Sequence, residues 1–318
     1  MQHVPYVNLM PETFDTPLHY TEAELQLLQD TSLYHNTMQR LERTAENAER
    51  GWAWLHSACR DAHDPIFAHV LSPIDKHRWL SLWRWADDVY GSRSFPAHLA
   101  GWEGMQGQEP VLIPGLDSFN HGRGVPVTWE KNDGITLLLR SSIPANAQVL
   151  NNYGAKSNEE LLAAYGFVQA DGPDDVLVLA LRAQEKAQSA MFYWKRSDDS
   201  PPQALLDALR RQMGFAPNEA QATCDANIAS LLQEAQVVEA LERFLQQRSK
   251  AFQHSHAEAE DAVPWSKDGD SVRERVLSSI LEYRRGQARL LDQALDWTEA
   301  KLDAILAALD KKGYTIGG

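Results

Sequence analysis

Two short polar motifs, separated by a segment with β-strand character, constrain this sequence more than any other feature. The first motif is Asp117-Ser118-Phe119-Asn120-His121, and the second, Asn151-Asn152-Tyr153-Gly154, follows after residues 122–150. Asparagine, histidine and tyrosine side chains carry many hydrogen-bonding groups and little apolar surface. Because an unpaired polar group is costly to bury, such motifs make a poor core and favour a binding site.

The length and composition predict a globular protein of two domains. The 318 residues exceed what one small domain needs, and a hydrophobic fraction of 43% suffices for a sizeable core. Two cysteines, Cys59 and Cys224, are too few for a disulfide framework and favour a reducing compartment. The sequence shows neither a signal-peptide pattern nor the roughly 20 consecutive apolar residues of a membrane helix. We therefore expect a cytoplasmic or nuclear protein without a membrane segment.

The net charge of −14, from 44 acidic and 30 basic residues, argues against non-specific binding to nucleic acid, because phosphate contacts need lysine and arginine. A negative surface is compatible with a basic protein partner, since complementary charge speeds encounter. It is equally compatible with a surface that only keeps the protein soluble. Charge therefore excludes one class of partner without selecting another.

Helical periodicity dominates residues 20–110 and returns from about residue 184. In the first region we expect a helix that begins at Ser72-Pro73, with proline at its first position, and stops near Gly91. The predicted core-facing residues of this helix are Trp79, Leu80, Trp83, Ala86 and Tyr90. In the second region we expect a helix over residues 228–248, a polar loop over 253–270 and a helix from near Ser271. The predicted buried face of that last helix comprises Val276, Ile280, Tyr283, Gln287, Leu290 and Leu291.

The segment between these helical regions has β-strand character. Val125–Trp129 and Ile135–Leu139 are β-like runs, and the turn signal Asn132-Asp133-Gly134 between them predicts a hairpin. A short β-like run over residues 148–150 and a brief helix over 157–164 follow. The order of helices, strands and helices predicts an α+β protein.

Several familiar catalytic motifs are absent from the sequence. There is no GxGxxG after a strand, no GxxxxGK[ST], no GxSxG and no HExxH. His254 and His256 have acidic neighbours, but the polar segment around them favours a solvated loop over a metal site. We therefore expect no bound metal.

The two motifs in this order resemble the SET-domain protein-lysine methyltransferases, in the branch that contains the Rubisco and ribosomal-protein lysine methyltransferases. The first part of the resemblance rests on Pro114, Asp117, Asn120 and His121. The second part rests on Tyr153-Gly154, Ser157-Asn158, Leu161-Leu162 and Tyr165-Gly166-Phe167. Weaker similarities at residues 14–18, 85–95 and 283–287 extend the resemblance over nearly the whole chain.

The resemblance implies a partial, β-rich SET core with a helical insertion, followed by an all-α C-terminal domain. In these terms residues 1–172 form the SET domain, with the helical insertion at about 20–110 and the C-terminal part of the core at 111–172. Residues 173–318 form a domain similar to the family's substrate-binding domain. SET domains of this type begin with β-strands upstream of the insertion, and we expect that first part to be missing from this sequence.

The implied reaction is methyl transfer from S-adenosylmethionine to a lysine ε-amine of a non-histone protein, with a ribosomal-protein-like substrate favoured. The lysine must first lose a proton, and with a reference pKa of about 10.4 this costs roughly 4.6 kcal/mol at pH 7. A narrow, apolar channel lowers that cost because it disfavours the charged form. The remaining catalysis is alignment and electrostatic preorganisation, without a metal or a covalent intermediate.

The resemblance also implies roles for individual residues. Tyr153 matches the catalytic tyrosine, which could orient the amine, stabilise charge or accept a proton. The positions that match cofactor-binding residues are Asn120, His121, Arg93 and Tyr165. Ser92 and Asp117 match substrate-binding positions near the lysine entrance. The residues by themselves leave alternatives open, because Ser92 and Arg93 suit an ordinary helix C-terminus and Asp117 suits a structural turn.

Three functions stay open from the sequence. The first is a monomeric lysine methyltransferase that acts on a basic protein, with no nucleic-acid or membrane partner. The second is a non-catalytic or truncated SET-like module that binds proteins through its helical C-terminal half. The third is a protein-histidine methyltransferase, since some members of the same branch methylate histidine and the shape of the pocket selects the acceptor.

Overall fold

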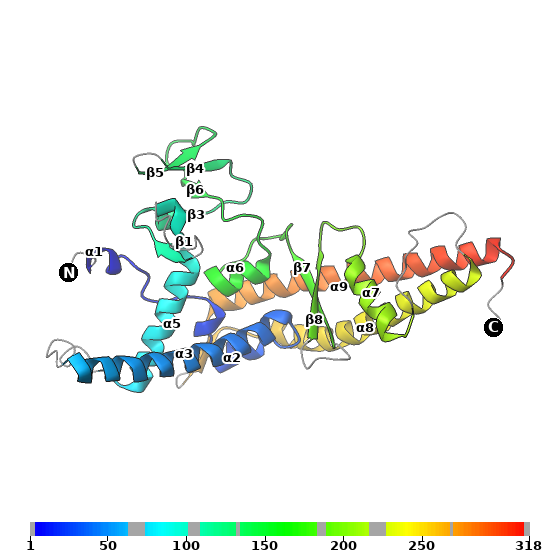
Figure 1. Cartoon of the computed structure of the whole chain (residues 1–318), viewed down its shortest axis with the longest axis horizontal. Helices are drawn as coiled ribbons and strands as arrows, with labels where there is room; N and C mark the ends of the chain where they lie inside the picture. The colour runs from blue at the N-terminus through cyan, green and yellow to red at the C-terminus, as the bar shows by residue number, and fades with distance from the viewer. Residues whose placement is uncertain are drawn as a thin grey trace. The chain divides into compact units, whose positions relative to one another are not determined.

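The structure is a computed structural model that describes residues 4–62, 74–100, 109–131, 134–182, 189–215, 227–267 and 270–314 (Figure 1). Its helices are α1 (Val4–Val7), α2 (Glu22–Gln26), α3 (Ser32–Ala62), α5 (Lys76–Arg93), α6 (Asn158–Tyr165), α7 (Gln203–Gln212), α8 (Ile228–Glu260) and α9 (Glu274–Lys311), and its 3-10 turns are η1 (Pro17–His19), η2 (Ala97–Ala100) and η3 (Leu116–Ser118). Its strands are β1 (Ser94–Pro96), β2 (Pro110–Leu112), β3 (Asn120–His121), β4 (Val127–Lys131), β5 (Ile135–Leu139), β6 (Leu150–Asn151), β7 (Val176–Arg182), β8 (Ser189–Lys195), β9 (Trp265–Lys267) and β10 (Asp270–Val272). Among these described helices, none combines the length and the apolar composition that crossing a membrane requires.

The chain divides into two compact units. Unit 1 comprises Met1–Thr21, His35–Lys156 and Glu160–Phe167, and unit 2 comprises Glu22–Tyr34, Ser157–Glu159 and Val168–Gly318. Both units contain helices and paired strands, so the predicted α+β class is confirmed.

In unit 1, tryptophan rings join helices α3 and α5. The ring centroids of Trp52 and Trp79 lie 5.7 Å apart, and those of Trp79 and Trp83 lie 5.6 Å apart. The indole nitrogen of Trp79 also donates to the Ala48 carbonyl at 2.7 Å. Gly51 faces Trp83 so closely that a Cβ at Gly51 would lie 2.4 Å from the ring. The two tryptophans that the spacing predicted on the core-facing side of α5 therefore pack against a neighbouring helix.

Helix α5 differs from its predicted bounds. It begins after Asp75, whose carboxylate accepts from the Arg78 amide at 2.7 Å as an N-cap. The predicted start at Ser72-Pro73 lies outside the described residues. The predicted stop at Gly91 is wrong, because the helix continues to Arg93. A single glycine inside a helix costs only about 1 kcal/mol, which packing can offset.

The buried face of α5 also needs a correction. Tyr90, predicted as a core residue, is 49% exposed, whereas Asp88 is fully buried. The carboxylate of Asp88 accepts hydrogen bonds from Thr16 and Arg40. A carboxylate can take an interior position because buried donors replace the water that it loses.

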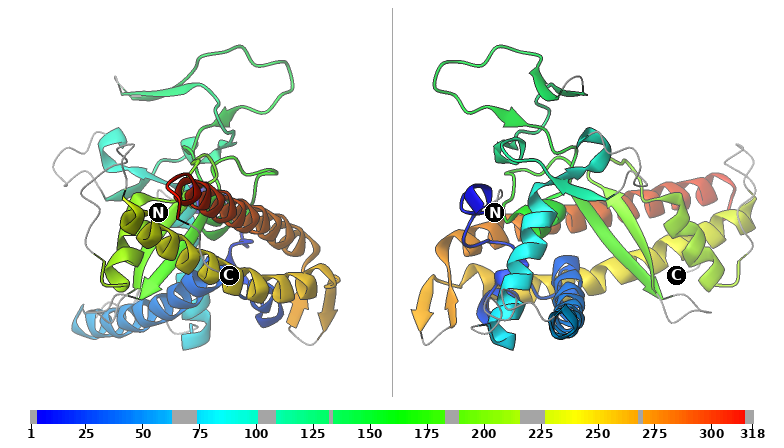
Figure 2. Two further views of the ribbon diagram at one scale, coloured as in Figure 1. Left: turned by 90° about the vertical axis from the view of Figure 1, so that its right-hand side faces the viewer. Right: turned by 60° about the vertical axis from the view of Figure 1, so that its left-hand side comes forward.

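The strands of unit 1 form short two-stranded pairs. β4 and β5 make the antiparallel hairpin that the sequence predicted, with Val127 opposite Leu139 and Thr128 opposite Leu138. β1 pairs antiparallel with β2, and β3 pairs in parallel with β6. Figure 2 shows the β4–β5 hairpin joined to β3 and to β6 by segments without regular structure, residues 122–126 and 140–149. The parallel pair of β3 and β6 is the part of this arrangement that positions the site.

In unit 2, helices α8 and α9 run side by side and carry much of the core (Figure 1). The face of α9 predicted from its spacing is confirmed as buried, and it comprises Val276, Ile280, Tyr283, Gln287, Leu290 and Leu291. The helix begins at Glu274 rather than near Ser271. Ser271 belongs instead to β10, where it pairs with Ser266 of β9.

Unit 2 also contains a long β-hairpin, which corrects the prediction of an all-α C-terminal domain. β7 pairs antiparallel with β8 over their whole length, from Val176 opposite Lys195 to Arg182 opposite Ser189. The alternate leucines of β7 are buried in one core with residues of α7, α8 and α9. A short apolar run of this kind cannot be distinguished from a buried helix by periodicity alone. Only the packing of the run on the helices shows that Leu177, Leu179 and Leu181 face this core.

The predicted polar loop over residues 253–270 is wrong as well. Helix α8 continues to Glu260, and the β9–β10 hairpin follows it. Along this last part of α8 the buried residues are Phe252, Ser255 and Ala259. Their spacing of three and four gives the segment a buried face. Serine and alanine are only weakly hydrophobic, and histidines and glutamates lie between them in the sequence. The hydrophobic pattern of this segment is therefore too weak to predict a buried helix face.

His256 gives this part of unit 2 a titratable contact. Its Nδ1 accepts from Arg284 Nε at 3.4 Å, and its ring stacks on Phe252 with centroids 5.4 Å apart. Burial lowers the pKa of His256 below its ordinary value of 6.5, Glu260 acts in the opposite direction, and Arg284 and Arg285 add to the lowering. The folded state therefore disfavours the imidazolium form.

We expect the free energy of unfolding to fall as the pH drops below about 6.5, because the unfolded chain then binds a proton that folded His256 disfavours. His256→Gln should flatten this part of the profile, measured by urea denaturation from about pH 8 to about pH 5. His254→Gln is the matched control, because His254 lies on the same helix with a side chain 82% exposed. Equal flattening by both substitutions would contradict the assignment to His256.

Candidate functional site

The two polar motifs meet at the short parallel strand pair of unit 1. β3 and β6 align Asn120 with Leu150 and His121 with Asn151, and the Gly122 amide donates to the Asn151 carbonyl at 2.7 Å. A Cβ at Gly122 would lie 2.5 Å from the Val125 side chain and 2.7 Å from the Leu150 side chain, so a larger residue there would force these side chains to shift. The strand pair thus brings together two motifs that are distant in the sequence.

Tyr153 is held both at its backbone and at its hydroxyl. Its amide donates to His121 Nδ1 at 3.0 Å, and its hydroxyl donates to the Phe119 carbonyl at 2.7 Å. The rings of His121 and Tyr153 stack with centroids 5.0 Å apart and an interplanar angle of 25°. The first motif therefore sets the position of the tyrosine in the second.

Further rings extend this contact into an aromatic cluster, which we define as His121, Tyr153, Tyr165 and Phe167. Tyr165 stacks on Tyr153 with centroids 4.9 Å apart. Phe167 lies 6.1 Å from Tyr165 and 6.3 Å from His121. The glycine between Tyr165 and Phe167 has a φ of 75°, a left-handed conformation that favours glycine. The Tyr-Gly-Phe sequence therefore allows both rings to reach the cluster.

The phenols of the cluster are protonated at neutral pH. Burial raises the pKa of Tyr153, Tyr165 and Asp117 raise it further, and Arg93 opposes them. Burial also raises the pKa of Tyr165, with a smaller contribution from Glu160. A hydroxyl that keeps its proton can donate it in a hydrogen bond, as Tyr153 does to the Phe119 carbonyl.

Asp117 and Arg93 bind each other in the same unit. Arg93 Nη1 donates to the Asp117 carbonyl at 3.1 Å and to its carboxylate at 3.3 Å. The Tyr6 hydroxyl donates to that carboxylate at 2.8 Å, and the Gly115 amide donates to it at 3.1 Å. With its side chain only 2% exposed, Asp117 holds together a turn, which is one of the two roles that the sequence left open.

Tyr6 is a residue of this region that the sequence analysis missed. Burial raises its pKa, and the hydrogen bond to Asp117 raises it further. The two residues are 111 positions apart, so no local pattern connects them. A tyrosine beside a proline near the start of the sequence carries no signal of its own for such a contact.

The other predicted residues occupy different positions. Ser92 donates to the Asp88 carbonyl at 2.6 Å within the last turns of α5, and the side chain of Asn120 lies exposed on β3. Asn158 of the second motif belongs to unit 2 instead of the site. Its amide and side chain bind the Asp175 carboxylate at 2.6 and 3.2 Å. This part of the motif therefore has a structural role at the start of α6.

The groups that the site can offer to a ligand are hydroxyls, carbonyls and aromatic rings. Within the described part of the chain, no three histidine, cysteine, aspartate or glutamate side chains are grouped so as to hold a metal ion. His254 and His256 lie on α8, where one side chain is 82% exposed and the other 18%. Polarised hydroxyls and ring faces suit the binding and alignment of a positively charged group.

Comparisons with curated proteins find two kinds of N-methyltransferase. The chain is 30% identical over 178 residues to Ribosomal lysine N-methyltransferase set10 of Schizosaccharomyces pombe, covering 55% of this chain and 29% of that protein. It is 27% identical over 165 residues to Actin-histidine N-methyltransferase of Mus musculus, covering 51% of this chain and 26% of that protein. The chain thus spans less than a third of the length of either relative. No protein-family model matches the chain.

The structure is similar to a solved SET domain. The SET domain of LSMT, solved with lysine and AdoHcy, aligns with a TM-score of 0.63 and 19% identity over 94% of this chain and 71% of that one. At this identity the likeness establishes the fold. Together, the fold and the named relatives confirm the predicted resemblance: the chain is similar in sequence to lysine and histidine N-methyltransferases and in fold to a SET domain.

Proposed function

We propose that this chain is a protein N-methyltransferase that uses S-adenosylmethionine to methylate a lysine ε-amine of a non-histone protein, with ribosomal proteins as favoured substrates. The observation that carries the proposal is the Tyr153 hydroxyl, held on the Phe119 carbonyl at 2.7 Å within the aromatic cluster. The similarity to a ribosomal lysine methyltransferase supports the acceptor and the substrate class. In this proposal residues 1–172 act as the SET domain and residues 173–318 as the substrate-binding domain.

The chemistry of the site suits the proposed cofactor. S-adenosylmethionine, when bound, supplies a methyl group activated by a sulfonium cation. The phenol oxygens of Tyr153 and Tyr165 carry lone pairs that attract a cation, and Asn120 and His121 offer backbone and side-chain hydrogen bonds for the polar ends of the cofactor. Arg93 donates to Asp117 from one nitrogen, and its guanidinium has five N–H groups with which it can also bind a carboxylate.

The protonation state of Tyr153 favours two of its three possible roles, orienting the amine and stabilising charge, over accepting a proton. The raised pKa keeps the phenol neutral at pH 7, and the proton points to the Phe119 carbonyl. The lone pairs of the phenol oxygen are then what Tyr153 offers to an incoming amine and to the positive charge that develops beside it. We therefore assign Tyr153 to orienting the amine and stabilising charge, because a phenolate base is scarce at neutral pH.

The net charge is compatible with a basic substrate. With 44 acidic and 30 basic residues, the chain is negatively charged, and complementary charge speeds encounter with a basic protein. Ribosomal proteins, which bind RNA phosphates, belong to that class. We propose that the protein acts as a monomer in the cytoplasm or the nucleus and has no nucleic-acid partner of its own.

Methyl transfer from labelled S-adenosylmethionine to ribosomal proteins tests the proposal. The purified chain should label untreated ribosomal proteins, and mass spectrometry should find the methyl group on lysine. The matched control is the same substrate with its lysine amines already blocked by acetylation, which turns each amine into a non-nucleophilic amide that should take up no label. Labelling that survives the blocking, or labelling of actin on histidine, would instead support the histidine methyltransferase suggested by the relative from Mus musculus.

A second measurement, cofactor binding, separates an enzyme from a non-catalytic module. Calorimetry of the chain with S-adenosylmethionine is expected to give binding in the range of about 1 μM to 1 mM that is usual for substrates. Absence of both binding and transfer would contradict the proposed function and favour a protein-binding module.

A further inference from the structure

Tyr165 of the aromatic cluster sits in a stretch of chain that is held on both sides. Two residues before it, the Ala163 carbonyl accepts from Arg40 Nη1 at 2.8 Å. One residue after it, Gly166 runs against the backbone of residues 15 and 16, and a Cβ there would lie 2.9 Å from the Asp15 carbonyl carbon. The ring between these two points has little freedom to move away from Tyr153.

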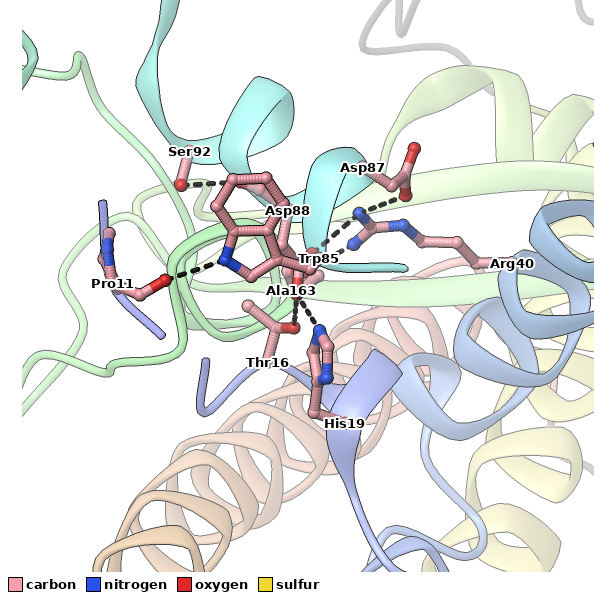
Figure 3. Close-up of polar contacts among 9 residues, drawn as sticks. All are labelled: Pro11, Thr16, His19, Arg40, Trp85, Asp87, Asp88, Ser92 and Ala163. Atoms are coloured by element: carbon pink, nitrogen blue, oxygen red, sulfur yellow. Dashed lines mark hydrogen bonds and ion pairs between the residues drawn. The ribbon is translucent and has the colours of Figure 1, made fainter. Parts of the chain in front are cut away.

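The hydrogen bond from Arg40 to the Ala163 carbonyl uses one terminal nitrogen of the guanidinium group, and the other terminal nitrogen binds two carboxylates. While Nη1 of Arg40 binds Ala163, Nη2 donates to Asp87 Oδ2 at 2.8 Å and to Asp88 Oδ1 at 3.1 Å (Figure 3). The planar, rigid fork of arginine makes such divided contacts possible. The orientation of the group is therefore set by the two carboxylates and transmitted to the end of α6.

The second restraint leads to the same carboxylate. Thr16, against which Gly166 packs, is fully buried and donates from its hydroxyl to Asp88 Oδ2. His19 Nε2 lies 3.1 Å from that oxygen (Figure 3). Asp88 itself is fully buried, and charge-assisted bonds of this kind are short and directional. Residues 163 and 166 are thus both held by groups that converge on Asp88.

We propose that Arg40, oriented by Asp88, is a positioning residue that holds the Tyr165 ring against Tyr153. Arg40 does not touch the aromatic cluster and acts on it only through the backbone at the end of α6. The catalytic consequence rests on the proposed methyl transfer, because Tyr165 then keeps Tyr153 in its productive orientation. Misplacement of an aligned group by about 1 Å can cost on the order of 100-fold in rate.

The test is a double-mutant cycle between Arg40→Lys and Tyr165→Leu, read by near-ultraviolet circular dichroism of the tyrosines. Lysine keeps a positive charge for Asp87 and Asp88 but is a point charge without a fork. In the wild-type chain, Arg40→Lys is expected to remove most of the signal that Tyr165→Leu removes. In the Tyr165→Leu background it should change the signal little, because the ring that it positions is gone. Additive changes would overturn the proposal.

Arg50→Lys is the matched control, since Arg50 lies exposed on the same helix and donates to the side chain of Asn47. It is expected to leave the tyrosine signal unchanged. Should Arg40→Lys fail to fold, the cycle is run with Asp88→Asn, which keeps the size of the side chain that contacts Arg40 and removes its charge. An unchanged tyrosine signal in that variant would overturn the proposal, whereas a partial loss that vanishes in the Tyr165→Leu background would support it.

Enzyme kinetics of the same variants distinguish a failure of the Arg40 proposal from a failure of the proposed methyltransferase function. In an active chain, Arg40→Lys should lower kcat by about 10-fold or more and change the KM for S-adenosylmethionine little, because alignment is lost rather than binding. In the Tyr165→Leu background the same substitution should have almost no effect on kcat. A chain without any methyl transfer contradicts the proposed function alone, since the spectroscopic cycle still decides whether Arg40 positions Tyr165.

Discussion

Tyr153→Phe is expected to lower the rate of methyl transfer by about 100-fold to 1000-fold, the usual effect of removing one preorganised hydroxyl from a transition state. The substitution deletes the oxygen that lies 2.7 Å from the Phe119 carbonyl and leaves the ring in place. Stacking on His121 and Tyr165 is retained, so the aromatic cluster should keep its shape. We therefore expect kcat to fall and the dissociation constant for S-adenosylmethionine to stay nearly the same.

The measurement combines the methyl-transfer assay with calorimetry of cofactor binding. Tyr193→Phe is the matched control, because Tyr193 lies on β8 and is 58% exposed. It should keep the wild-type rate. If Tyr153→Phe retained a rate within a factor of about three of wild type, the hydroxyl would have no part in the transition state. A parallel loss of cofactor binding would point to a collapsed site rather than to a lost catalytic group.

Arg284→Met is expected to lower the free energy of unfolding by about 3–5 kcal/mol, the typical cost of breaking a buried charged network at one partner. Arg284 is fully buried in unit 2. Its guanidinium donates to the carbonyls of Leu27 and Gln29 at 2.9 and 2.8 Å and to the Ser255 hydroxyl at 2.7 Å. It also lies 4.7 Å from the centre of the Phe252 ring. Methionine fills part of the volume and leaves these acceptors without their donor.

Arg284 keeps its charge at neutral pH in spite of its position. Burial lowers its pKa to about 10, while Tyr283, Asp30 and Glu258 act to raise it. Urea denaturation followed by tryptophan fluorescence measures the loss of stability. Arg285→Met is the matched control on the next residue, whose side chain is 49% exposed, and it should change the stability by no more than about 0.5 kcal/mol. Similar losses in both variants would contradict the structural role of Arg284.

Helix α9 shows what helical periodicity can and cannot predict about burial. The spacing along residues 276–291 predicted which side chains of α9 are buried, because each turn of a helix presents its face at intervals of three and four. The same rule predicted that Tyr283 and Gln287 belong to this buried face, and both are buried. It could not predict that an arginine would join that face, because its partners lie 255 and 257 positions away.

The β7–β8 hairpin shows where local patterns are ambiguous. Its residues from Val176 to Leu181 form a short apolar run that suits a buried helix as well as a strand. Pairing with β8 decides in favour of the strand, because it satisfies the backbone hydrogen bonds of both segments. The end of α8 was missed for the opposite reason, since its buried face uses Ser255 and Ala259 instead of large apolar side chains.

The sequence by itself determined the family resemblance and the location of the candidate site. The residue types in the two motifs, their order and the β-like segment between them are local properties, and the resemblance that they carry selects Tyr153, His121 and Tyr165 as candidates. The tertiary structure alone decided how those rings are held. Asp88 binds Thr16 across 72 positions and Arg40 binds Ala163 across 123. Such pairs depend on which distant surfaces pack together, and that is a property of the whole fold, which no single segment encodes.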